Sequence, residues 1–112
     1  MDCLFCKIAA GEIPSKKIYE DEDLLAFYDI NPEAPVHFLV IPKKHIASAA
    51  ELCSENSVIV AKIFVAISRI AKELGLSSGY RIVNNCGEDA GQTVQHLHFH
   101  VLAGRSLAWP PG

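Results

Sequence analysis

No stretch of the chain approaches the roughly 20 consecutive apolar residues that a membrane-spanning helix needs. The N-terminus, MDCLFCKIAAGEIP, carries Asp2 where a secretory signal peptide is positively charged, and its apolar run is short. Lys and Arg together number only 10, against 13 Asp and Glu, and they form neither a basic stripe for nucleic acid nor a polybasic segment for a membrane surface. We therefore expect a cytoplasmic protein that binds neither nucleic acid nor membranes.

The sequence also lacks internal repeats, low-complexity tracts and linkers. With 112 residues, of which 50% are hydrophobic and 21% charged, it is long enough for one packed core and too short for two. We expect residues 1–112 to form a single domain. In a reducing compartment its four cysteines are expected to be thiols or metal ligands rather than disulfides.

Residue patterns predict an α+β fold. FCKIAAG is typical of a short N-terminal helix that ends near Gly11. Alternating or continuous apolar residues bounded by turn residues predict strands at 17–20, 24–29, 36–42 and 80–85, and a fifth in the histidine-rich segment near the C-terminus. The predicted architecture is a five-stranded sheet with one long helix on one face and the short N-terminal helix.

The long helix is predicted over SENSVIVAKIFVAISRIAKELGL, from an N-cap near Ser54 to Gly75. Apolar residues at three- and four-residue steps predict a core-facing stripe. A second apolar set lies partly off this stripe, which indicates either a wide buried face or a second contact surface. The stripe consists of Val60, Ile63, Phe64, Ile67, Ile70, Ala71 and Leu74, and the second set of Val58, Ile59, Val65 and Ala66.

Three of the five histidines, His96, His98 and His100, alternate with apolar residues in GQTVQHLHFHVLAGR. A strand would place all three imidazoles on one face. Burying a row of imidazoles for packing alone is costly, because each needs a donor and an acceptor partner. The pattern therefore favours a metal site or a catalytic site. His37, on the apolar strand 36–42, is either an ordinary polar core residue or a member of the same site.

The loop NNCGEDAGQT directly precedes the histidines. Gly87 and Gly91 permit a tight backbone path, and the loop can present backbone N–H groups with the Gln92 and Thr93 side chains to an anion. An anion cradle followed by a nucleophilic imidazole suits phosphoryl or nucleotidyl transfer.

These residues resemble a known family. HLHFHVL is similar to the His-φ-His-φ-His-φ-φ signature of the histidine triad superfamily, where φ is hydrophobic. EIPSKKIYEDEDLLAFYDINPEAPVHFLVIPKKHI, LGLSSGYRIVNNCGEDAGQTVQHLHFHVLAGR and the final WPPG resemble its nucleotide-binding branch, so the likeness covers essentially the whole chain. The resemblance implies an antiparallel sheet and a homodimer that joins the sheets of two subunits. It also implies purine nucleotides as ligands (AMP, GMP and their phosphoramidates) and hydrolysis of the P–N bond to release the nucleoside monophosphate.

The resemblance also implies roles for individual residues. His98 would be the nucleophile that forms a nucleotidyl-histidine intermediate, and His100 and His37 would orient the site and move protons. Thr93, where close relatives usually have Ser, would contact the leaving nitrogen. Tail 104–112 would reach the neighbouring subunit's site. The implied nucleotide-binding set is Leu4, Phe5, Ile8, Phe27, Asp29, Asn85, Gln92, Thr93, His98, His100 and Trp109. Since backbone N–H groups would hold the phosphate oxygens, we expect no catalytic cofactor.

CLFC is a C-x2-C pair, and Cys3 and Cys6 with His45 and His96 would complete a Cys2His2 zinc set. Bacterial members of the superfamily carry zinc with this pattern, whereas many animal relatives lack the cysteines, so His45 and His96 can instead have hydrogen-bonding roles alone. Other functions remain open: a nucleotide-binding or regulatory module with incidental hydrolysis, a dinucleoside polyphosphate hydrolase, and a purely zinc-stabilised interaction domain. His100 and the WPPG ending argue against the polyphosphate hydrolase, which usually has Gln at the third triad position.

Overall fold

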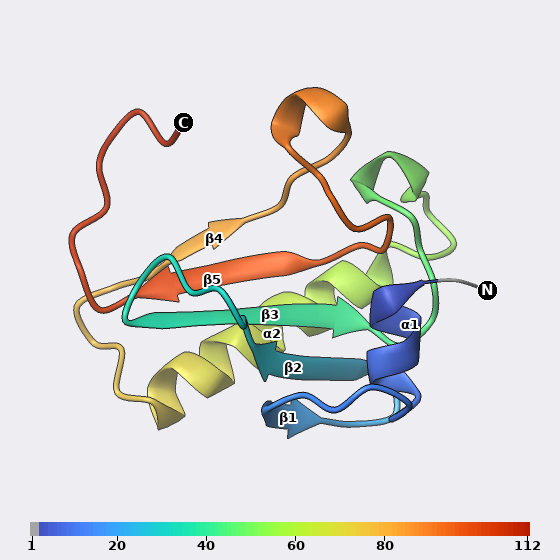
Figure 1. The fold of residues 1–112 in the computed structure, drawn as a ribbon, viewed down its shortest axis with the longest axis horizontal. Coiled ribbons are helices and arrows are strands. Elements are labelled where there is room, and N and C mark those ends of the chain that lie inside the picture. The colour runs from blue at the N-terminus through green and yellow to red at the C-terminus, as the bar shows by residue number, and fades with distance from the viewer. Residues whose placement is uncertain (1–2) are drawn as a thin grey trace.

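The computed structural model describes residues 3–112 and shows a five-stranded antiparallel sheet with two α-helices (Figure 1). The strands lie in the order β1-β2-β3-β5-β4, which confirms the predicted fold class. None of the helices in the described part of the chain is long and apolar enough to cross a membrane. The elements are α1 (Leu4–Ala9), β1 (Lys17–Glu20), β2 (Leu24–Tyr28), β3 (Val36–Pro42), α2 (Val58–Glu73), β4 (Arg81–Val83) and β5 (Phe99–Ala103), with short 3-10 turns η1 (Ala49–Glu51) and η2 (Glu88–Ala90).

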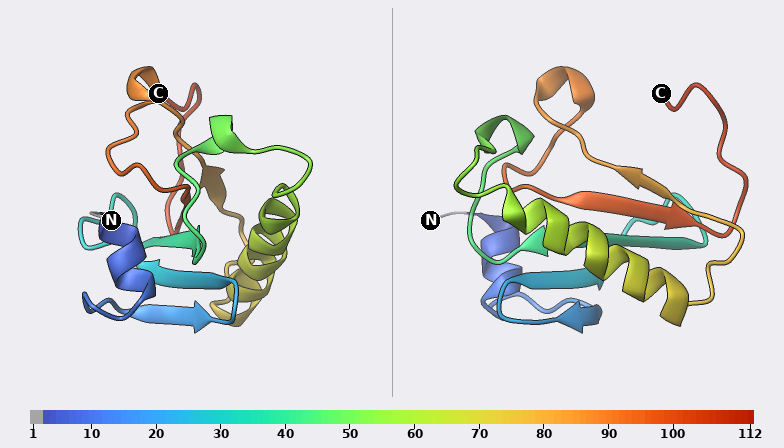
Figure 2. Two further views of the ribbon diagram at one scale, coloured as in Figure 1. Left: turned by 90° about the vertical axis from the view of Figure 1, so that its right-hand side faces the viewer. Right: turned by 180° about the vertical axis from the view of Figure 1, so that it is seen from behind.

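The two helices lie on opposite faces of the sheet (Figure 2). Because successive side chains of a strand point to opposite faces, the apolar strands β2 and β3 contribute side chains to the apolar clusters on both faces of the sheet. Leu24 and Phe38 pack with α2, whereas Leu25 and Leu39 pack with α1. The same alternation sends Leu97, Phe99 and Val101 to the α2 face. It leaves the histidines on the α1 face, so the sheet lies between the histidines and the apolar core under α2.

The long helix begins later than predicted. Its first residue is Val58 and its N-cap is Ser57, not a residue near Ser54. The Asn56 side chain explains the difference, because it accepts from the Cys53 N–H at 2.8 Å and donates to the Glu51 carbonyl at 3.1 Å. These bonds draw residues 54–57 into turns instead of a first helical turn.

The stripe on α2 is narrower than predicted. Ile63, Ile67 and Ile70 are fully buried, but Phe64 and Leu74 of the predicted stripe are exposed, and Ala66, placed off the stripe, is buried. Val58 and Val65 are exposed, at 63% and 61%. Of the second apolar set, Ala66 is buried and Ile59 packs partly buried against the core, whereas Val58 and Val65 form apolar surface on the outer side of the helix.

Three strand boundaries also differ. The strand predicted over 24–29 ends at Tyr28, and the one predicted over 80–85 covers only Arg81–Val83. The histidine strand begins at Phe99, so His96, which lies in a bend, and His98 both precede it. The ladder between β3 and β5 stops at Val40 and Phe99 because the next groups have other partners. The His96 Nε2 forms a hydrogen bond with the Pro42 carbonyl, and the Leu97 N–H donates to the Ile46 carbonyl.

Candidate active site and metal centre

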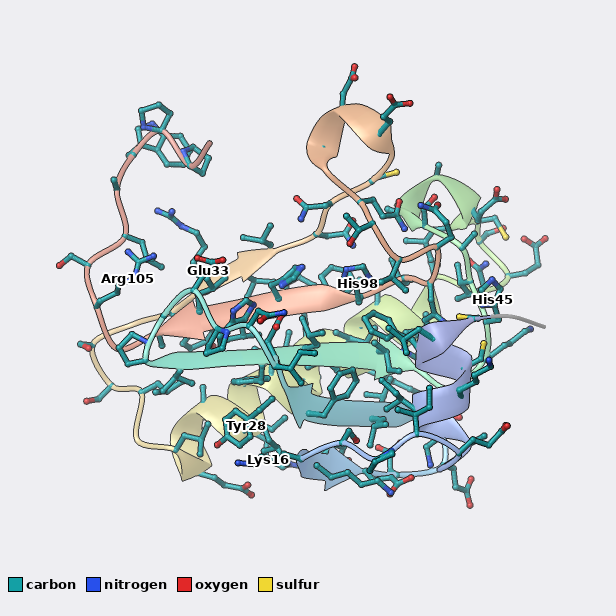
Figure 3. The ribbon with its side chains drawn as sticks, viewed as in Figure 1. Lys16, Tyr28, Glu33, His45, His98 and Arg105 are labelled. Carbon is teal, nitrogen blue, oxygen red and sulfur yellow. The ribbon has the colours of Figure 1, made fainter. Side chains whose placement is uncertain are left out.

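Three imidazoles meet on the α1 face of β3 and β5. The His98 and His100 ring centroids are 5.1 Å apart, and those of His37 and His100 are 5.2 Å apart. The antiparallel register brings the rings together, because it pairs His37 with Leu102 and Leu39 with His100. His37 is buried, so it belongs to this cluster and is not an isolated polar residue of the α2 core. Figure 3 shows His98 at the beginning of β5, close to α1.

The tautomer of His98 is fixed by a backbone carbonyl. Its Nδ1 lies 2.7 Å from the carbonyl oxygen of His96, and only an N–H can satisfy that oxygen. In the neutral ring Nε2 is then unprotonated and carries a lone pair. The side chain is 5% exposed, and the edge of the Phe5 ring packs against it with centroids 5.0 Å apart. His98 is thus oriented to present a nucleophilic nitrogen.

His37 and His100 have the opposite arrangement. The Glu33 backbone N–H donates to His37 Nδ1 at 3.1 Å, so neutral His37 carries its proton on Nε2. That Nε2–H donates to His100 Nδ1 at 2.9 Å, which leaves the His100 proton on Nε2. Burial, followed by the nearby His98 and His37, lowers the pKa of His100 to about 4, although Asp29 opposes this. His100 is therefore a neutral N–H donor beside the unprotonated Nε2 of His98.

Asp29 completes this group but does not make it a metal site. One carboxylate oxygen, Oδ1, accepts from the Asn31 N–H at 2.8 Å, and Oδ2 lies 3.5 Å from His37 Nε2. Asp29, His37 and His100 have ligand atoms within 4.8 Å of one another, as a metal site would require. A metal on His37 Nε2, however, would force the proton onto Nδ1, which already faces the Glu33 N–H donor. The donor set fits a proton between the two rings and does not fit a metal ion.

The loop before β5 is held by Gln92. Its side chain accepts from the Gly87 N–H at 2.9 Å and donates to the carbonyls of Ala47 and Val94. With all three bonds made to backbone, the buried Gln92 amide shapes the loop from within. Thr93 is exposed and Asn85 half-buried at the same loop. These two side chains and the backbone are the groups that the loop offers to an anion.

Among the residues predicted to form the base slot, Phe5, Ile8 and Phe27 are buried together with β2 and β3. The Phe5 and Phe27 rings meet edge to face with centroids 5.6 Å apart. Leu4 differs, with 47% of its surface exposed. The structure therefore places Phe5 between the sheet and His98, and leaves Leu4 on the outer side of α1.

Sequence reasoning missed Asn84. Its side chain donates to the His98 carbonyl at 2.9 Å and continues the β4–β5 pairing beyond the last ladder pair, Val83 with His100. The main chain of His98 is thus pinned on the β4 side of the sheet. An asparagine in a loop gives no periodic signal, so only the fold shows that it lies opposite His98.

A second cluster joins α1 to the start of the histidine segment. Cys3 Sγ and Cys6 Sγ lie 3.3 Å and 3.5 Å from His96 Nδ1, and His45 Nδ1 lies 3.3 Å from Cys6 Sγ and 3.2 Å from His96 Nδ1. Tetrahedral Zn²⁺, with Zn–S of about 2.3 Å and Zn–N of about 2.05 Å, places sulfur and nitrogen ligands about 3.5 Å apart and nitrogen ligands about 3.3 Å apart. The four distances agree with these separations to about 0.3 Å.

The hydrogen bonds behind the four ligand atoms also suit a metal ion. His96 Nε2 donates to the Pro42 carbonyl at 2.8 Å, so Nδ1 is the unprotonated nitrogen and faces the cysteines. Burial lowers the pKa of His96, which keeps the ring neutral. Burial, then the hydrogen bond and charge of Cys3, raises the pKa of the Cys6 thiol, so a metal ion would have to displace a proton from sulfur. Cys3, Cys6, His45 and His96 form a donor set that fits zinc.

A model of the HIT domain matches residues 10–107, which is most of the chain. The chain belongs to the HIT domain family. An uncharacterized HIT-like protein of Synechococcus elongatus is 50% identical over 111 residues, which cover 99% of this chain and 97% of that protein.

Solved structures of HIT proteins have the same fold. A HIT family hydrolase from Legionella pneumophila is 49% identical with a TM-score of 0.97, and the match covers 99% of this chain and 100% of that one. A histidine triad nucleotide-binding protein from Candida albicans is 34% identical with a TM-score of 0.83, covering 97% and 83% of the two chains.

The C-terminal tail of this HIT chain runs beyond the end of β5 (Figure 1). The Arg81 guanidinium donates to the carbonyls of Leu107 and Ala108 at 3.5 Å and 3.0 Å and so holds the tail beside β4. Trp109 remains 81% exposed. A cavity of about 520 Å³ lies between the tail, β4 and β5, away from the histidines.

Proposed function

We propose that this HIT protein hydrolyses purine nucleoside phosphoramidates and releases the nucleoside monophosphate through a covalent intermediate on His98. The observation that carries the proposal is the pair of opposed tautomers. A backbone carbonyl leaves the His98 Nε2 lone pair free, while the Glu33 N–H and His37 leave His100 with a proton on Nε2. A nucleophile and a hydrogen-bond donor therefore lie side by side on the same sheet face.

The reaction follows in two balanced steps. In the first, the His98 Nε2 lone pair forms a bond to phosphorus as the P–N bond breaks, and the leaving nitrogen takes one proton from water, so that the positive charge gained by His98 is balanced by hydroxide. The neutral His100 keeps its proton on Nε2 and donates a hydrogen bond to the phosphoryl group. In the second, the hydroxide attacks phosphorus and His98 leaves as the neutral ring. The products are the nucleoside monophosphate and the amine.

The remaining groups fit the binding of a nucleotide. The Asp29 carboxylate would accept from the ribose hydroxyls, and the apolar side chains near Phe5 would contact the base. The exposed Thr93 hydroxyl, the Asn85 side chain and backbone N–H groups of the 86–95 loop would hold the phosphoryl oxygens, as electrostatic stabilisation of a transition state requires. No catalytic cofactor enters either step.

We also propose that zinc occupies the cluster of Cys3, Cys6, His45 and His96. Its role is structural: it ties α1 to the segment that carries the nucleophile. Metal analysis of protein purified without chelator is expected to give one zinc per chain, and a Cys6→Ser variant should lose it. A Cys53→Ser variant, which changes an exposed thiol outside the cluster, is the matched control and should keep the zinc.

A homodimer in the cytoplasm completes the proposal. β4 is an edge strand of three residues, and α2 exposes Val58, Phe64 and Val65. An unpaired edge and exposed apolar side chains suit joining of two sheets across a twofold axis. In such a dimer the exposed Trp109 of the tail would reach the partner's site and shape its leaving-group pocket.

The decisive experiment uses an adenosine phosphoramidate with a fluorogenic amine, assayed without added metal. Wild type should release the amine, and His98→Ala should not. Intact mass of a quenched wild-type sample should rise transiently by one AMP. Cys53→Ser, which removes an exposed thiol outside the site, is the control and should keep both signals. Binding of AMP without turnover in wild type would refute the hydrolase and favour a nucleotide-binding module.

A further inference from the structure

The loop between β2 and β3 holds the residue that sets the tautomer of His37. Through its backbone, Glu33 makes two contacts: its N–H donates to His37 Nδ1 at 3.1 Å, and its carbonyl accepts from the Arg105 side chain. The Glu33 side chain itself is exposed. The position of this residue, and not its carboxylate, therefore decides where the His37 proton lies.

Arg105 donates hydrogen bonds to the Glu33 carbonyl from two nitrogens. Its Nε and Nη2 donate to this oxygen at 3.1 Å and 2.9 Å, while Nη1 donates to the Ser106 carbonyl at 3.1 Å. Charge-assisted bonds from a planar guanidinium are stronger and more directional than neutral ones. Figure 3 shows Arg105 and Glu33 next to each other, near the end of β5 and the beginning of β3.

A glycine lets the loop approach this closely. Gly104 has φ +91°, and a Cβ there would lie 2.9 Å from Pro35 Cβ. The turn after β5 thus packs directly on the 30–35 loop and directs Arg105 toward Glu33. This contact and the Arg105 hydrogen bonds hold the loop independently of the histidines.

We propose that Arg105 is a positioning residue for the active site, acting through Glu33 on the His37–His100 pair; the proposal rests on the hydrolase function proposed above. Arg105 keeps the Glu33 N–H on His37 Nδ1, which keeps the His37 proton on Nε2 and the His100 proton on its own Nε2. Without Arg105 the Glu33 peptide loses its side-chain donors and can turn its N–H away from His37 Nδ1, and both rings gain a second tautomer. In that second tautomer His100 has no N–H on Nε2 to donate to the substrate.

The test is a long-range ¹H–¹⁵N spectrum of histidine-labelled protein, which shows directly which ring nitrogen carries the proton. Wild type, Arg105→Ala and Arg81→Ala are compared at neutral pH. Arg81 is the matched control, because it also donates to backbone carbonyls, those of Leu107 and Ala108 in the tail, but does not contact Glu33. Steady-state kinetics on the adenosine phosphoramidate accompany the spectra, and thermal unfolding verifies that each variant is folded.

In wild type we expect His37 and His100 protonated on Nε2. Arg105→Ala should show mixed tautomers at both rings and a fall in kcat of about tenfold, a part of the contribution of a hydrogen-bond donor to the transition state, with KM nearly unchanged. Arg81→Ala should keep the wild-type tautomers. Single Nε2-protonated tautomers in Arg105→Ala, or equal tautomer changes in both variants, would overturn the proposal.

A Glu33→Pro variant tests the same link without touching Arg105, because it removes the donating N–H. Its matched control is Glu33→Ala, which keeps both backbone groups. We expect mixed tautomers only in Glu33→Pro, and wild-type tautomers there would also overturn the proposal. The spectra decide this even if wild type hydrolyses no phosphoramidate, a result that would refute the proposed function separately.

Discussion

His100 makes folding stability depend on pH in a predictable direction. Its pKa falls from the ordinary 6.5 to about 4 in the folded protein, chiefly because the ring is buried. Between these values the unfolded chain binds more protons than the folded one, so the free energy of unfolding rises with pH in this range. The stability is fully present above pH 6.5 and is lost as the pH falls toward 4.

The magnitude follows from the same two values. Linkage gives a loss of about 2 kcal/mol at pH 5 relative to pH 7. His100 is only half-buried, so solvent screening reduces the expected effect to about 1 kcal/mol. His100→Gln removes the titrating group but keeps an oxygen that can accept from His37 Nε2–H, which makes it a suitable variant.

Urea unfolding of wild type and His100→Gln at pH 5 and pH 7, both with chelator, measures the effect. Any contribution of the Cys/His cluster is common to both proteins and cancels in the difference. Wild type should lose about 1 kcal/mol more than the variant on acidification. Parallel losses, or a greater loss in His100→Gln, would refute the assignment of His100 as a ring kept neutral by burial.

Two further substitutions test how the site is held. Gly104→Ala should lower the free energy of unfolding by about 1–3 kcal/mol in a urea titration, because alanine at this positive φ is strained and its Cβ meets Pro35; Gly112→Ala, where no atom lies within 4 Å, should have no effect. Asn84→Ala should reduce kcat on the phosphoramidate several-fold, about 1 kcal/mol for the lost hydrogen bond, with KM unchanged; an unchanged kcat would show that the His98 main chain needs no such support.

The sequence predicts the sheet, both helices and the faces of β5 because these follow from apolar periodicity. Alternation of His96, His98 and His100 with Leu97 and Phe99 is enough to separate the imidazole face from the core. The superfamily resemblance supplied the grouping of His37 with the triplet, and the antiparallel register of β3 and β5 shows how it arises.

What could not be predicted depends on single hydrogen bonds between segments far apart in sequence. Three such bonds give no periodic pattern in the sequence. The Glu33 N–H donates to His37, the Arg105 guanidinium donates to the Glu33 carbonyl, and the Asn84 side-chain amide donates to the His98 carbonyl. The start of α2 was missed for a similar reason, because the Asn56 side chain competes with the helix backbone for partners. Boundaries and tautomers are set by such local competition, whereas the architecture is set by burial.

His96 serves two groups at once, since its ring faces the cysteines and its carbonyl holds the His98 ring. Moving the chain by one residue anywhere between His96 and Phe99 would exchange the imidazoles with the leucine and phenylalanine of the core. Insertions and deletions are therefore forbidden in this stretch even though individual side chains can be replaced. We expect the length of the segment to be invariant among proteins that share this site, while the exposed turn at 54–57 is free to grow or shrink.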